Sequence, residues 1–162
     1  MTPVHVHLML NHAPLFGCAV CALLLSFALW RGSEDLKRAA FGLLVISALI
    51  TIPVYLTGEP AEETVEHFPG VTKAAIHAHE SAAKFALAGM IATGIVALIG
   101  LLFSWKRLIP NWLTIGMLLL SLFSGTLMIR TANLGGKVRH TEIGGDDQKT
   151  IEAHHEEEHE DD

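Results

Sequence analysis

The stretch HVHLMLNHAPLFGCAVCALLLSFALW at residues 5–30 sets three histidines immediately before a long apolar run. A helix needs roughly 20 mostly apolar residues to cross about 30 Å of hydrocarbon, and this run is close to that length. Imidazole is polar and able to bind metal, so beside such a span it needs a polar partner or a ligand role. No Lys or Arg precedes Arg31, and we therefore expect this segment to be retained rather than removed as a signal peptide.

The whole chain has the composition of a membrane protein. Of its 162 residues, 51% are hydrophobic and only 17% are charged, with a mean hydropathy of +0.42, whereas soluble domains carry about 25% charge. Four apolar segments qualify as membrane helices, approximately at residues 13–30, 39–57, 81–105 and 112–129. Short connections make sequential helices antiparallel. The sequence predicts an all-α, integral membrane, up-down-up-down four-helix bundle.

Charge divides the chain into two regions. Residues 141–162 hold ten acidic residues and one lysine, and this tail lacks aromatic side chains, so we expect it to be disordered. Residues 1–140 form the predicted transmembrane domain. Two short turns, residues 31–38 and 106–110, carry five Lys or Arg. The density of positive charge in short loops predicts that these turns are cytoplasmic and that both termini lie outside the cytoplasm.

Histidines gather at one face of this topology. Outside the tail they number seven, and they come from before the first helix, after the second, before the third and after the fourth: His5, His7, His12, His67, His77, His79 and His140. One interpretation is that they are solvated loop residues. The other is that some converge on a metal or a haem, because helical bundles hold cofactors between facing helices. Haem iron would need ligands from opposed helices, whereas zinc or copper would favour a compact set such as Glu63, His67, His77 and His79.

Other polar residues have simpler expected roles. His77 and His79 differ by about 200° around a helix, so only one is expected to face inward. Glu80 and Lys84 have the i,i+4 spacing of a local ion pair. Arg130 is expected either to reach the membrane interface or to pair with a haem propionate. Cys18 and Cys21 are interpreted as small packing residues.

Several motifs together resemble a known family. HLMLNHAP at residues 7–14 is similar to the HPxLVHFP opening of a bacterial family of predicted four-helix integral membrane proteins of unknown function, although Leu8 replaces its first proline and Ala13 its Phe. The other matching positions lie at helix ends: Thr57, Gly58, His77 or His79, Gly135, Gly136, Arg139 and His140. The resemblance covers roughly residues 7–143. It implies up to four rim histidines, enough for two six-coordinate b-type haems, in the bacterial inner membrane.

The candidate axial ligands are His7, His12, His79 and His140, with His77 and His67 as substitutes. This set leads us to expect a b-type cytochrome with one or two bis-His haems, an electron-transfer subunit of a membrane redox complex rather than a stand-alone enzyme. Its expected partners are other redox subunits, a quinol, a basic soluble electron carrier and the lipid bilayer, with no nucleic acid. The alternatives are a zinc- or copper-binding or transport protein, and a non-catalytic assembly subunit. No catalytic residue is assigned.

Overall fold

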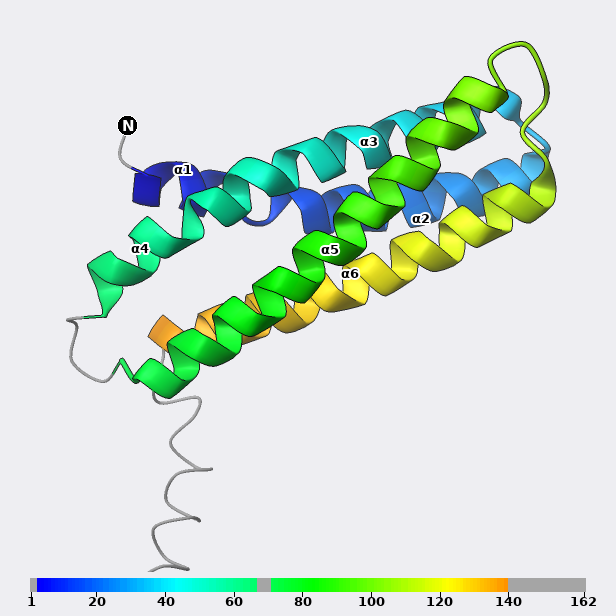
Figure 1. The fold of residues 1–162 in the computed structure, drawn as a ribbon. Coiled ribbons are helices and arrows are strands. Elements are labelled where there is room, and N and C mark those ends of the chain that lie inside the picture. Colours follow the sequence, from blue (N-terminus) through cyan, green and yellow to red (C-terminus); the bar gives the residue numbers. More distant parts are fainter. Residues whose placement is uncertain (1–2, 67–70, 140–162) are drawn as a thin grey trace, which may run out of the picture.

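The computed structural model describes residues 3–66 and 71–139, and every regular element within them is an α-helix (Figure 1). The helices, in chain order, are α1 (Pro3–Leu10), α2 (Ala13–Arg31), α3 (Glu34–Leu56), α4 (Gly58–Val65), α5 (Lys73–Phe103) and α6 (Asn111–Arg139). Four helical stretches are long and apolar enough to cross a membrane. The expected disordered tail and His140 lie outside the described residues.

The four long helices form an antiparallel bundle, as predicted. Helix α2 packs against α3 and α6, and α5 packs against the same two helices, so the four close into a ring (Figure 1). Fully buried side chains fill its centre: Leu25, Phe41, Leu44, Met90 and Met117. Close approach of the backbones needs small residues, and a β-carbon built on Gly94 would overlap that of Ala48.

Local sequence signals explain where the first helices begin and end. Pro14 has no N–H to donate to Leu10, and the chain turns at residues 11–12, so α1 and α2 are separate. Gly32 adopts the left-handed conformation, with φ of 64°, that ends α2. The hydroxyl of Ser33 then accepts a hydrogen bond from the Leu36 N–H at 3.4 Å and caps α3.

Two helices are longer than hydrophobicity alone predicted. Helix α5 begins at Lys73 rather than near residue 81, after Thr72, whose hydroxyl accepts a hydrogen bond from the Ala75 N–H at 3.2 Å. Helix α6 continues to Arg139 rather than ending near residue 129. The extra turns of α5 contain three alanines together with Lys73 and Glu80, which favour a helix, whereas the extra turns of α6 contain Gly135 and Gly136, which do not. His79 therefore lies on α5 and not in a loop.

The surface of the bundle suits a lipid environment. In each of the four candidate spans, only 33% of the most apolar stretch of 18 residues is buried inside the protein. Large apolar side chains face outward along every long helix, among them Leu23, Leu49, Phe85 and Leu119. Cys18 and Cys21 are buried, as expected of packing residues, with 2% and 0% of their surface exposed. The chain is a multi-pass membrane protein.

One end of the bundle, which we call the tryptophan end, consists of residues 30–38 and 104–112 and carries Trp30, Trp105 and Trp112. Its two loops are joined by Lys37, whose ammonium donates to Glu34 Oε1 at 2.6 Å, to the Ile109 carbonyl at 2.8 Å and to Asn111 Oδ1 at 2.9 Å. Glu34 Oε2 accepts from the Ile109 N–H at 2.7 Å. This network ties the loops into one rigid unit.

Candidate functional site

A large cavity opens at the other end of the bundle, which we call the histidine end. Its volume is about 760 Å³, within the usual range of cofactor sites, and all six helices contribute to its lining. Polar side chains lie toward its mouth: His7, Asn11, His12, Tyr55, Glu59, Glu62, His79 and Glu80. Apolar side chains line the part that enters the bundle: Leu15, Ala83, Ala86, Leu87 and Met128. We call this space the histidine cavity.

His7 reaches the cavity from α1. Its Nδ1 lies 2.9 Å from the carbonyl oxygen of Val54, near the C-terminus of α3, where helix carbonyls lack intrahelical partners. A carbonyl can only accept, so Nδ1 carries the proton and Nε2 keeps its lone pair. The ring also packs beside Gly58, at 3.6 Å from the position of a β-carbon there. His7 is thus held in one orientation by the junction of α3 and α4.

His79 reaches the cavity from α5 in the same manner. Its side chain is 17% exposed, and its Nδ1 donates to the carbonyl oxygen of Thr131 on α6 at 3.0 Å. The ring lies against Gly135, where a β-carbon would be 2.9 Å from His79 Cε1. Its Nε2 lies 4.0 Å from Glu62 Oε1. His7 and His79 come from different helices, α1 and α5, and are close enough to interact electrostatically.

His12 is the third histidine of the cavity. It occupies the turn between α1 and α2, is exposed, and its Nδ1 contacts Oδ1 of Asn11. In all three imidazoles Nδ1 contacts an oxygen atom, and Nε2 of His79 faces the Glu62 carboxylate at 4.0 Å. Histidines that bind metals are commonly oriented in this way, because the bond at one nitrogen fixes the tautomer and the direction of the other.

Of the remaining predicted site residues that the structure describes, His77 and Arg130 do not line the cavity. The side chain of His77 is 77% exposed and is 3.5 Å from Glu80 Oε2, so of the pair His77 and His79 only the latter faces inward, as predicted. Glu80 also forms the expected ion pair with Lys84, at 2.8 Å. Arg130 lines a separate groove on the outside of α5 and α6. It does not line the histidine cavity, so it is not placed to pair with the propionate of a haem bound there. His67 and His140 lie outside the described residues.

The compact metal set considered from the sequence is not assembled by the residues that the structure describes. Glu63 and His77 are exposed, and no group of three His, Cys, Asp or Glu side chains in residues 3–66 and 71–139 is arranged to hold a metal ion. The imidazoles that line the cavity are those of His7, His12 and His79, and Glu62 lies beside the last of them.

Three contributors to the site were not predicted from the sequence. The carbonyl groups of Val54 and Thr131 orient the partly buried His7 and His79, and the missing side chain of Gly135 makes room for the latter. Every residue has a backbone carbonyl, so the amino-acid sequence does not show which carbonyls accept these hydrogen bonds. The pair Gly135 and Gly136 inside a helix was a usable signal, because glycine weakens a helix unless something packs against it.

No protein-family model matches this chain, and no curated protein or solved structure matches it.

Proposed function

We propose that this membrane protein binds haem b in the histidine cavity and transfers electrons as a subunit of a membrane redox complex. The observation that carries the proposal is the paired orientation of His7 and His79, each of which donates Nδ1–H to a backbone carbonyl and keeps Nε2 for a ligand. The two rings approach from α1 and α5 across a space of about 760 Å³.

The protein residues have distinct tasks in this proposal. His7 and His79 would hold the iron through their imidazole nitrogens, and Leu15, Ala86 and Met128 would make apolar contacts with the porphyrin and exclude water. Bound haem supplies a one-electron ferric–ferrous couple. With two imidazole ligands no iron position stays open, which favours electron transfer over oxygen chemistry. His12, which also lines the cavity, would be one ligand of a second haem, and His140 is the proposed other ligand.

The acidic mouth of the cavity supports a docking role for a basic electron carrier. Glu59, Glu62 and Glu80 line this mouth, and the tail at residues 141–162 adds further negative charge. Clusters of one sign steer oppositely charged proteins, and salt screens this attraction. A quinol or another redox subunit within the membrane is the proposed donor.

A visible spectrum and a metal analysis of the purified full-length protein test this proposal. We expect a reduced b-type haem spectrum that is lost in His7→Ala and in His79→Ala. His77→Ala is the matched control, because that imidazole is on the same helix but points away from the cavity. Bound zinc or copper without haem would support the metal-binding alternative, and neither haem nor metal would support an assembly subunit; both results would reject the proposal.

A further inference from the structure

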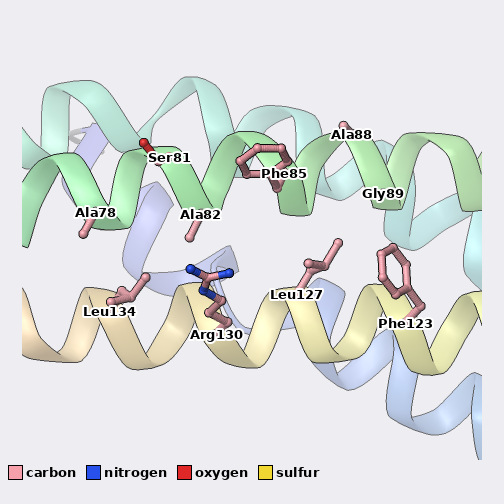
Figure 2. A pocket seen from close by; sticks show the side chains of 10 residues that line it. All are labelled: Ala78, Ser81, Ala82, Phe85, Ala88, Gly89, Phe123, Leu127, Arg130 and Leu134. Carbon is pink, nitrogen blue, oxygen red and sulfur yellow. The ribbon is translucent and has the colours of Figure 1, made fainter.

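A second hollow, separate from the histidine cavity, lies on the outside of the bundle between α5 and α6 (Figure 2). It has a volume of about 610 Å³. Its walls are mostly apolar, with Phe85 on α5 and Phe123 and Leu127 on α6. Gly89 leaves room in the wall, since a β-carbon there would be 2.9 Å from Leu127 Cδ1. We call this hollow the α5–α6 groove.

Arg130 supplies a positive charge to the α5–α6 groove. Its side chain extends from α6 toward α5 and lies beside Ala82 (Figure 2). It is exposed and forms no ion pair with any residue in the described part of the chain. Glu80, which lines the histidine cavity and not this groove, pairs with Lys84 at 2.8 Å. Lys137 is seven residues after Arg130, on the same face of α6, and adds a second cation.

The position of Arg130 along α6 matches the edge of the hydrocarbon. Trp112 marks the opposite interface, and the 18 residues from there to Arg130 span about 27 Å, close to the thickness of the hydrocarbon core. From Arg130 inward to Phe123 the groove runs about 10 Å, roughly two thirds of the depth of one leaflet. The groove is therefore apolar along the outer part of an acyl chain and cationic where headgroups lie.

We infer that the α5–α6 groove binds an anionic phospholipid from the leaflet at the histidine end. The guanidinium of Arg130 contacts the phosphate, and one acyl chain lies along Phe85, Leu127 and Phe123. A cation close to a lipid surface favours anionic lipid, and a guanidinium matches a phosphate with parallel hydrogen bonds. This site uses a different face of α5 and α6 from the histidine cavity and does not depend on haem.

Native mass spectrometry of the full chain in mild detergent tests this inference. The probes are phosphatidylglycerol and phosphatidylcholine with identical acyl chains, so that only the headgroup charge differs. We expect the wild-type protein to retain phosphatidylglycerol preferentially. Arg130→Gln should reduce that preference about fivefold, the factor equivalent to about 1 kcal/mol per cation at a lipid surface. Arg130→Lys should keep most of it.

Lys106→Gln is the matched control, because it removes one exposed positive charge at the tryptophan end. It should leave the lipid preference unchanged. Equal retention of both lipids by the wild-type protein would overturn the inference without any variant. An equal loss of the lipid preference in Lys106→Gln would also overturn the inference. Displacement of phosphatidylglycerol by inorganic phosphate alone, or by an isoprenoid quinol, would overturn it too.

Discussion

The imidazole of His79 on α5 lies against Gly135 on α6, with its Cε1 2.9 Å from where a β-carbon of residue 135 would be. The same ring donates Nδ1–H to the Thr131 carbonyl one turn earlier on α6. Helix α6 therefore provides both the acceptor and the space that fix this histidine, and its Nε2 lies 4.0 Å from Oε1 of Glu62, another residue that lines the cavity. The geometry of the candidate ligand thus depends on a residue that has no side chain.

Gly135→Ala should therefore displace the His79 ring. Overpacking of this kind costs about 1–3 kcal/mol, and we expect weaker haem retention and a lower Tm. Gly136→Ala is the control, since no atom lies within 4 Å of its β-carbon position, and it should be neutral or slightly stabilising through helix propensity. Haem retention during gel filtration and thermal unfolding measure the two effects. Identical behaviour of the two variants would contradict this packing.

His79→Asn separates the structural from the ligand role of this histidine. The Asn amide nitrogen is placed like Nδ1 and can still donate to the Thr131 carbonyl, but nothing replaces Nε2. We expect His79→Asn to lose haem while the apoprotein stays more stable than His79→Ala by about 0.5–1.5 kcal/mol, the net value of one hydrogen bond. Absorbance gives the haem content, and denaturant titration of the apoproteins gives the stability. Full haem content in His79→Asn would exclude Nε2 as a ligand.

Lys37→Met should destabilise the tryptophan end without changing the haem spectrum. The Lys37 ammonium is buried and joins Glu34, Ile109 and Asn111, so its loss leaves the last two without their donor. Such unsatisfied groups cost about 1–3 kcal/mol each. Thermal unfolding in detergent measures the loss, with the exposed Lys106→Met as control. If both variants have the wild-type Tm, the network does not stabilise the loops.

Cys18 and Cys21 should be protected from thiol reagents while the bundle is folded. Their sulfur atoms contact Met90 and the Ala40 carbonyl inside the core. We expect maleimide labelling only after denaturation, and mass spectrometry of the labelled protein counts the modified thiols. A cysteine introduced at the exposed position Ala74, which precedes the apolar part of α5, serves as the reactive control. Rapid labelling of the native cysteines would mean that α2 does not pack as described.

The sequence was sufficient to predict the bundle, because four apolar segments separated by charged or proline-containing turns leave few alternatives. It also predicted that only one of His77 and His79 faces inward, since residues two apart on a helix point in nearly opposite directions, but His77 stayed a substitute for His79 until the fold was known. It did not predict the full length of α5, because the high hydropathy that marks a membrane span begins near residue 81, whereas the helix itself begins at Lys73. The placement of Arg130 outside the histidine cavity depends on the rotation of α6, which packing determines and local sequence does not.

Electron paramagnetic resonance of the oxidised, haem-loaded protein tests the central claim most directly. If His7 and His79 ligate the same iron, the wild-type protein gives a low-spin ferric signal typical of two imidazole ligands. Removing either ring should then convert that signal to high spin or abolish it, while His77→Ala leaves it unchanged. A wild-type signal that persists in both His7→Ala and His79→Ala, or a protein that takes up no haem at all, would contradict the account.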